Sequence, residues 1–335
     1  MHIAAKTQRL KEKKPSNIVS SCLCAFVAVI SFAFFLFGYG LYHPAHMRQN
    51  RTPLTIMFAG DIMLGRQVGK AIQRANDPSL PFRVIFPEIR SADISIGNLE
   101  CVYADTLITG TYNHKIIRFP AYSEAVEGLK LAGFDCCSLA NNHSMDFGTD
   151  GVRSTIRTLE KNGIIPAGTI AANPVVIEKK GWTVAMFSYW VNRDSLWVVD
   201  PETGYVHIEE EPLLQTVGKV KKTCDIVILF LHWGKEYTGT RSETQRNFAH
   251  RAVRAGADLI VGHGPHQIQE IEYCGNSLIA YSLGNCVFDQ KYEETQKGLL
   301  LRVVFDSTSD RPQSTPLPIL IRNDTFVTTL MEAGY

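Results

Sequence analysis

Short apolar runs alternate with amphipathic segments along most of the chain after residue 53. Short apolar runs bounded by turn residues are typical of buried strands. Strands are expected at residues 54–59, 94–97, 135–140, 184–189, 226–231, 259–261 and 278–281. Helical patterns lie between several of these runs, at residues 123–132, 151–161 and 243–255. This alternation indicates βαβ units with right-handed crossovers.

The last part of the chain has a different pattern. Residues 298–305 and 317–321 look like consecutive strands with no helix between them, which indicates antiparallel additions to the sheet. A chain of 335 residues can bury a large core in one α/β domain. We therefore expect an α/β domain with mixed sheets that begins near residue 54, after a linker at residues 43–53.

The chain begins with a basic segment, residues 1–17, followed by an apolar run at residues 18–42 that contains no charged residue. About 20 apolar residues are enough to cross a bilayer. A cleaved signal peptide is the alternative, but its hydrophobic region would be only about 7 to 15 residues long. We therefore expect a single-pass anchor in the cell membrane, with the basic tail in the cytoplasm and the domain outside.

The net charge and the spacing of the cysteines limit which partners and which kinds of cysteine site are expected. The formal net charge is +1, so no overall field favours nucleic acid as a partner. The cysteines after the apolar run have no spacing typical of a small disulfide framework, and no CxxC pair is present. Cys136 and Cys137 lie within a strand-like run. Buried free thiols are therefore expected, rather than disulfides or zinc ligands.

Polar side chains gather at the ends of five strand-like runs, in residues 57–65, 96–100, 139–148, 231–237 and 261–269. In an open α/β sheet, ligand sites form at the carboxyl ends of the strands, so these segments can converge on one crevice. The polar residues are Asp61, Asn98, Glu100, Asn142, His143, Asp146, His232, Glu236, His263 and His266. Imidazoles combined with hard oxygen ligands indicate a divalent-metal site.

Each segment taken alone also permits a structural role. Asp61 could cap a helix, and Asn98 could stabilise a turn next to a solvated Glu100. The asparagines in residues 139–148 could cap the helix that follows, and a lone His232 could be a core residue. Convergence of all five segments on one crevice favours metal binding over five separate structural roles.

The order of six motifs resembles the CapA family of poly-γ-glutamate capsule synthesis proteins, whose domain is similar to calcineurin-like metallophosphoesterases. The motifs are GDxMxGR, GNLE, LANNHxxDxG, HWGxEY, GHGPHxxQ and YSLGNxVFDQ, at residues 60–66, 97–100, 139–148, 232–237, 262–269 and 281–290. The resemblance runs from residue 54 to about residue 323, so it implies a domain at residues 54–323 and a tail at residues 324–335. It implies a metallophosphoesterase-like α/β sandwich with a metal centre at one edge.

The resemblance also implies roles for individual residues. The implied metal ligands are Asp61, Glu100, Asn142, His232, His263 and His266, for a divalent ion such as Mn, Zn, Fe or Mg. His143 would act beside the metal as a general acid or would stabilise developing charge, with Asp146 fixing its orientation. Arg66 and Asn285 are assigned to substrate binding.

Two departures from the family patterns affect the metal site. Phosphoesterases usually have Asp-x-His in the first motif, whereas Ile62 and Met63 follow Asp61 here, so the first metal position lacks an imidazole. Many family members have HPH where this chain reads Gly264-Pro265-His266, and the other imidazole stands at His263.

The function implied is that of a membrane-anchored, extracytoplasmic protein in synthesis, export or anchoring of an anionic envelope polymer such as poly-γ-glutamate. The chain lacks the ATP-grasp or P-loop features of a polymer ligase, so membrane-bound synthase and export subunits are expected partners, together with the lipid bilayer. Two alternatives stay open. One is a stand-alone metal-dependent hydrolase of envelope phosphoesters or amides, and the other is a non-catalytic scaffold that binds the polymer.

Overall fold

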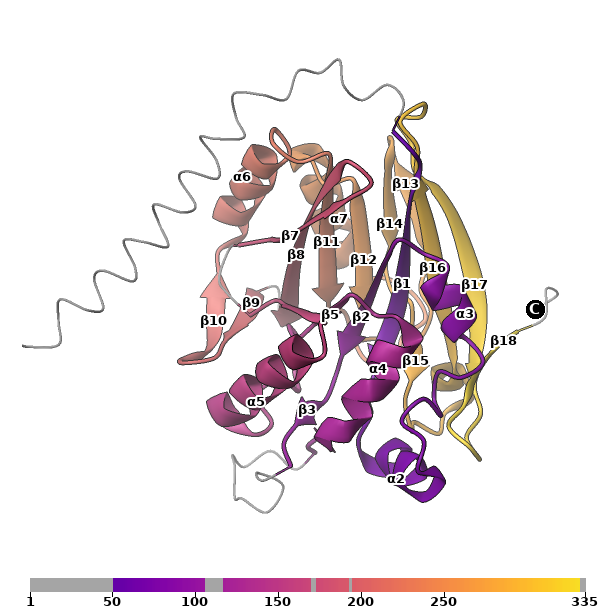
Figure 1. Cartoon of the computed structure of the whole chain (residues 1–335). Helices are drawn as coiled ribbons and strands as arrows, with labels where there is room; N and C mark the ends of the chain where they lie inside the picture. Colours follow the sequence, from indigo (N-terminus) through magenta and orange to yellow (C-terminus); the bar gives the residue numbers. More distant parts are fainter. Residues whose placement is uncertain (1–50, 106–116, 170–172, 193–194, 332–335) are drawn as a thin grey trace, which may run out of the picture. The chain divides into compact units, whose positions relative to one another are not determined.

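The computed structural model describes residues 51–105, 117–169, 173–192 and 195–331. The predicted basic tail and membrane anchor, and all but the last residues of the predicted linker, lie outside the described residues. Within the described ranges, no helix is both long and apolar enough to cross a membrane. These residues form two mixed sheets that pack face to face, with helices on their outer faces (Figure 1).

The first sheet contains both parallel and antiparallel strands. Its strands are β1 (Leu54–Ile62), β2 (Ile94–Leu99), β5 (Cys136–Ser138), β6 (Ile165–Ala167), β15 (Asn285–Val287), β16 (Lys297–Phe305), β17 (Gln313–Ile321) and β18 (Thr328–Leu330). Among the described residues their order is β18-β17-β16-β1-β2-β5-β6, and β15 also pairs with β1. Parallel pairs join β1, β2, β5 and β6.

The antiparallel strands at the end of the chain confirm the prediction from the sequence. β16 runs antiparallel to both β1 and β17. The sheet continues past residue 323, where the family resemblance ends, because β18 pairs antiparallel with β17. The Thr328 hydroxyl also donates a hydrogen bond of 2.7 Å to the carbonyl of Cys286, so β18 is fastened to the sheet.

The second sheet has a parallel centre and antiparallel edges. Its strands are β7 (Val175–Lys179), β8 (Trp182–Asn192), β9 (Ser195–Asp200), β10 (Gly204–Ile208), β11 (Ile226–His232), β12 (Leu259–His263), β13 (Ile271–Cys274) and β14 (Ser277–Ala280). β8, β11, β12 and β14 pair in parallel, whereas β7, β9, β10 and β13 pair antiparallel to their neighbours. The short strands β3 (Val102–Tyr103) and β4 (Pro120–Ala121) form a separate pair.

Helices connect the strands as the sequence predicts. The described helices are α2 (Arg66–Ala75), α3 (Phe86–Arg90), η2 (Ser123–Ala125), α4 (Val126–Ala132), α5 (Gly148–Lys161), α6 (Glu210–Val220), α7 (Glu243–Ala255) and η3 (Glu293–Gln296). α7 has the predicted limits. It begins at a capping box, in which the Ser242 side chain accepts a hydrogen bond from the Gln245 amide and Gln245 accepts one from Ser242.

Side chains of the central strands point alternately into two apolar layers. In β11, Ile228 and Phe230 enter the layer between the sheets, whereas Leu229 and Leu231 enter the layer beneath α6 and α7. Phe58 of β1 meets Phe230 in the central layer, with ring centroids 6.2 Å apart. Strands buried on both faces need apolar residues at every position, which explains the continuous apolar runs in the sequence.

The cysteines behave as the sequence predicts. All six in the described part of the chain are free, and Cys136 and Cys137 are buried in β5. Burial raises the pKa of the Cys101 thiol to about 12, and it raises the pKa of Cys136 as well. These thiols therefore act as small apolar side chains in the core.

The parallel strands of both sheets bring their carboxyl ends to one edge. Figure 1 shows the arrowheads of β2, β8, β11 and β12 directed toward the same side of the sheets. Within the first sheet, Asp61 of β1 pairs with Asn98 of β2. Within the second, His232 of β11 pairs with His263 of β12. The polar ends of these four strands therefore face one another across the edge.

Candidate metal centre

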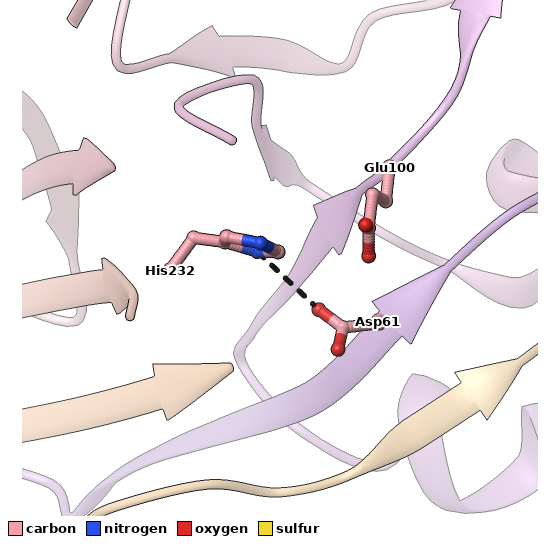
Figure 2. A group of neighbouring side chains, drawn as sticks. All are labelled: Asp61, Glu100 and His232. Atoms are coloured by element: carbon pink, nitrogen blue, oxygen red, sulfur yellow. Dashed lines mark ion pairs between the residues drawn. The ribbon is translucent and has the colours of Figure 1, made fainter. Parts of the chain in front are cut away.

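Three predicted metal ligands meet at this edge. Asp61 lies near the end of β1, Glu100 follows β2 directly, and His232 is the last residue of β11. One ligand atom from each lies within 4.8 Å of the others, and Figure 2 shows the three side chains converging. The relative exposures are 0% for Asp61, 0% for Glu100 and 6% for His232. We call these three residues the metal cluster.

Asn98 holds two members of the metal cluster in place. Its side-chain amide donates a hydrogen bond of 2.7 Å to Asp61 Oδ1, and the same nitrogen lies 3.1 Å from His232 Nδ1. The sequence places Asn98 among the polar residues that indicate a metal site, but the family resemblance does not name it as a ligand. The structure shows that this buried side chain links the two sheets at the cluster.

His266 lies against both carboxylates of the metal cluster. Its Nδ1 is 3.1 Å from Asp61 Oδ2, and its Nε2 is 3.9 Å from Glu100 Oε1. The residue has a left-handed backbone with φ of 57°, and its ring lies beside that of Tyr237 at a centroid distance of 6.1 Å. The predicted ligand is therefore in contact with the cluster.

Asn285 has a position different from the one expected of a substrate contact. It is fully buried, and its Oδ1 lies 3.0 Å from His266 Nδ1. Its amide nitrogen donates hydrogen bonds to Gln290 Oε1 and to the carbonyl of Thr295. Both polar atoms of the Asn285 side chain are therefore engaged within the protein. Its Oδ1 orients the His266 ring, and neither atom is left to contact a substrate.

His263 lies next to the metal cluster without joining it. The residue is 0% exposed, and its ring packs against Phe230 at a centroid distance of 4.0 Å. Neither ring nitrogen hydrogen-bonds any residue that the structure describes. A buried imidazole without partners is unfavourable, and a cation beside it would provide one.

The pKa shifts show which of these side chains carry charge. Burial lowers the pKa of His232 to about 3 and that of His263 to about 4, so both imidazoles are neutral. Burial disfavours a charged His266 as well, but Glu100 and Asp61 outweigh it and raise the pKa of His266 to about 9. Burial alone would raise the pKa of Asp61, yet the hydrogen bond and charge of His266 hold it below its ordinary value.

These donors fit a divalent cation. Buried carboxylates require positive charge nearby, and here a proton on His266 supplies it. Neutral imidazoles and ionised carboxylates are the forms in which histidine and aspartate bind metals. The residues that would hold the ion are Asp61, Glu100 and His232, with His263 and His266 adjacent.

His143 and Asp146 form the pair that the sequence predicts. Their side chains meet at 2.8 Å between His143 Nδ1 and Asp146 Oδ2, and His143 Nε2 lies 3.8 Å from Glu100 Oε1. Phe119 supports both residues, because its ring stacks on the imidazole at 3.7 Å and its backbone amide donates a hydrogen bond to Asp146 Oδ2. No pattern in the sequence marks Phe119 as part of the site.

The two adjacent asparagines have different surroundings. Asn141 is fully buried, donates a hydrogen bond of 2.9 Å to the carbonyl of Leu99, and accepts one of 3.0 Å from the His143 amide. It therefore fixes the loop to the end of β2. Asn142 lines a cavity together with His232 of the metal cluster, and its role as a metal ligand stays a prediction.

Arg66 lies near the pair formed by His143 and Asp146. Its Nε is 3.2 Å from the buried Asp289, and its guanidinium lies 5.2 Å from the ring centroid of Phe119. The Arg66 side chain is 41% exposed, so part of the guanidinium faces solvent. Its contact with substrate stays a prediction.

A family model and two curated relatives match most of this chain. Residues 55–290 match the family model described as "Bacterial capsule synthesis protein PGA_cap". The chain is 31% identical over 321 residues to the "PGA biosynthesis protein CapA" of Bacillus subtilis (strain 168), which covers 92% of this chain and 83% of that protein. It is 32% identical over 273 residues to the "Capsule biosynthesis protein CapA" of Bacillus anthracis, over 77% of this chain and 65% of that protein.

A solved structure gives a more distant match. The NAD nucleotidase NadN of Haemophilus influenzae aligns with a TM-score of 0.48 at 14% identity, covering 85% of this chain and 61% of that one. A similarity at this level does not by itself assign a fold or an activity.

Proposed function

The chain belongs to the PGA_cap family of bacterial capsule synthesis proteins, and from this premise we propose that it acts in synthesis, export or anchoring of an anionic capsule polymer such as poly-γ-glutamate. The Bacillus subtilis relative is a PGA biosynthesis protein, and the Bacillus anthracis relative is a capsule biosynthesis protein. Membrane-bound synthase and export subunits are the proposed partners. These partners would form the bonds of the polymer, because this chain lacks the ATP-grasp or P-loop features of a polymer ligase.

The observation that carries the proposal is the meeting of Asp61, Glu100 and His232 within 4.8 Å. We propose that the metal cluster holds a divalent cation, with Mn, Zn, Fe and Mg as candidates. When bound, such a cation supplies Lewis-acid catalysis. A buried group of two carboxylates and an imidazole has little structural purpose without a cation, because its charges destabilise one another or must be neutralised by protons.

The His143–Asp146 pair favours hydrolysis as a second candidate function. Asp146 accepts the hydrogen bond at His143 Nδ1, so that nitrogen carries the proton and Nε2 is left to exchange one. Nε2 is the atom that faces Glu100. This arrangement suits metal-dependent cleavage of an amide or phosphoester in envelope material, either as a step in polymer release or as an independent activity.

Deleting the gene is expected to abolish surface polymer in the source bacterium. The wild-type gene should restore it, whereas Asp61→Asn should not, because the neutral amide removes the charge of a cluster ligand. Polymer is measured as glutamate released by acid hydrolysis of the capsule fraction. Asp310→Asn, at an exposed carboxylate away from the cluster, is the matched control and should restore polymer fully. Normal polymer from the Asp61→Asn strain, at equal protein level, would contradict the proposal.

We further propose that residues 18–42 anchor the protein in the cell membrane with the domain outside. Protease added to intact cells should then remove the domain and leave only the short basic tail. An intact cytoplasmic protein in the same samples serves as the control for lysis. Protection of the domain, or a mature form that starts after residue 42, would exclude this arrangement.

A further inference from the structure

Asp289 is a buried carboxylate that lies at the start of α2. Its side chain is 1% exposed. Its Oδ2 accepts a hydrogen bond of 3.2 Å from the backbone amide of Gln67 and lies 3.2 Å from Nε of Arg66. Gly65 at the N-cap position of α2 has no side chain with which to accept such a bond, so Asp289 caps the helix from a distant part of the sequence.

Capping alone does not explain why this residue is charged. Serine and asparagine cap helices as well as aspartate does, without placing a charge in the core. Asp289 Oδ1 is buried and hydrogen-bonds no residue in the described ranges, and a buried charged oxygen without a partner costs stability. Within those ranges, Arg66 is the cation that pairs with Asp289. The charge of Asp289 therefore acts on Arg66.

The Arg66 guanidinium lies on the same aromatic ring as the His143 imidazole. The Arg66 backbone is left-handed with φ of 50°, a conformation that is uncommon for residues other than glycine. A Cβ on Gly65 would lie 2.0 Å from the carbonyl oxygen of Pro120, so the chain before Arg66 packs directly against the segment that carries Phe119. The guanidinium carbon lies 5.2 Å from the Phe119 ring centroid, and that ring stacks on the His143 imidazole at 3.7 Å. Arg66 is therefore a neighbour of the side chain that would exchange a proton.

Asp289 occupies one nitrogen of the guanidinium and leaves two. It pairs with Nε, and neither Nη1 nor Nη2 of Arg66 hydrogen-bonds a residue that the structure describes. The Arg66 side chain is 41% exposed, so a ligand can reach these nitrogens. The two terminal nitrogens of a guanidinium match the two oxygens of a carboxylate or phosphoryl group. Because Asp289 balances the charge of Arg66, the direction of these donors selects the ligand, and a net positive charge does not.

We propose that Asp289 is a positioning residue, which fixes Arg66 through Nε so that the two terminal nitrogens bind an oxyanion of the substrate beside His143. The inference rests on the proposed function and deepens it, because it names the group that receives the anionic part of the substrate and the side chain that holds this group. The ligand must carry a carboxylate or a phosphoryl group. Asp289 itself does not touch it.

The test is binding of phenylphosphonate and benzoate to the purified full-length protein with Mn²⁺ present, measured by isothermal titration calorimetry. The two acids have the same ring and differ in the anionic group, and neutral benzamide shows what the ring alone contributes. Arg66→Ala should weaken binding of the tighter acid by about 10-fold, as for loss of hydrogen bonds to a charged group. The tighter of the two acids shows whether the site takes a phosphoryl or a carboxylate group.

Asp289→Asn separates the positioning of Arg66 from the capping of α2. The amide still accepts a hydrogen bond from Gln67, so the melting temperature should be no lower than that of the wild type. The amide holds the guanidinium less firmly than a carboxylate does, so binding of the acid should weaken by about 3-fold. The double variant Arg66→Ala/Asp289→Asn should bind like Arg66→Ala alone, because Asp289 acts through Arg66. If Asp289 only neutralised Arg66, its replacement would instead strengthen the binding of an anion.

Asp93→Asn is the matched control for a buried carboxylate that pairs with a cation. Asp93 also accepts a hydrogen bond from a backbone amide, that of Thr55, and forms an ion pair with Lys180. It precedes β2 and lies at the opposite end of that strand from Glu100. This variant should therefore bind both acids like the wild type.

Wild-type or tighter binding by Asp289→Asn would overturn the inference, as would a wild type that binds neither acid more tightly than benzamide. An effect of Asp289→Asn that is equally large without the Arg66 side chain would also overturn it, because Asp289 would then act on the site by another route. None of these results decides the proposed function, which the Asp61→Asn strain tests separately.

Discussion

Chelation of metal from the purified protein is expected to lower its melting temperature by about 5 °C or more. An ion held by Asp61, Glu100 and His232 joins three strands from two sheets, so it binds the native state and not the unfolded chain. With free metal at about 100 times its dissociation constant, the free energy of unfolding rises by about 2.7 kcal/mol. Each kcal/mol shifts the midpoint by about 2 to 4 °C in a domain of 150 to 250 residues.

His232→Ala should remove this response, because it deletes the imidazole of the metal cluster. The protein should contain no metal by inductively coupled plasma mass spectrometry, and its melting temperature should not change with chelator or added metal. His207→Ala is the matched control, since that imidazole is 39% exposed and contacts Trp197 away from the cluster. A wild type that contains no metal and melts at the same temperature with and without chelator would exclude the metal site.

The apolar runs predict the central strands well because those strands are buried on both faces. They locate the ends less well. The predicted strand at residues 54–59 continues to Ile62, and Asp61 pairs with Asn98 and Asn285 within it. A polar residue ends an apolar run, so the sequence pattern stops too early. Gly60 shows why the strand can continue, because a Cβ there would lie 1.9 Å from the carbonyl oxygen of Gly284.

The pattern of apolar runs does not predict the edge strands, and the reason is again the degree of burial. β7, β10 and β13 are only partly buried, so their residues need not form an apolar run. Their positions are set by antiparallel pairing with a strand that is already in place. Strand preference at such positions depends on the neighbouring strand more than on the segment itself.

The residues of the candidate site also fall into two groups, those that the sequence identifies and those that only the structure identifies. Side chains that would bind a cation, such as Asp61 and His232, are recognisable because carboxylates and imidazoles at strand ends have few other uses. Side chains that position them are not, since their roles depend on distant partners. Phe119 supports His143 from 24 positions earlier in the sequence, and Asn285 orients His266. Only the folded chain reveals these contacts.

The largest expected effect on activity is that of His143→Ala, which should slow hydrolysis by about 100- to 10,000-fold while metal content stays at the wild-type level. The imidazole is held on one side by Asp146 and on one face by Phe119, so Nε2 is the atom that can give or take a proton near the cluster. Turnover is measured with bis(4-nitrophenyl) phosphate and with γ-linked glutamate oligomers, using whichever the wild type cleaves.

Two further variants separate loss of the proton from loss of packing. His143→Gln keeps most of the side-chain volume beneath Phe119 but cannot exchange a proton at neutral pH, so it should be as slow as His143→Ala. Asp146→Asn should keep His143 in place and give a smaller loss, because an amide still hydrogen-bonds Nδ1 but no longer favours the same tautomer. Both should retain the change in melting temperature on chelation. If the His143→Ala strain made surface polymer at the wild-type level with equal protein present, no step in polymer production would need that proton, and a non-catalytic role in binding the polymer would be the function that remains.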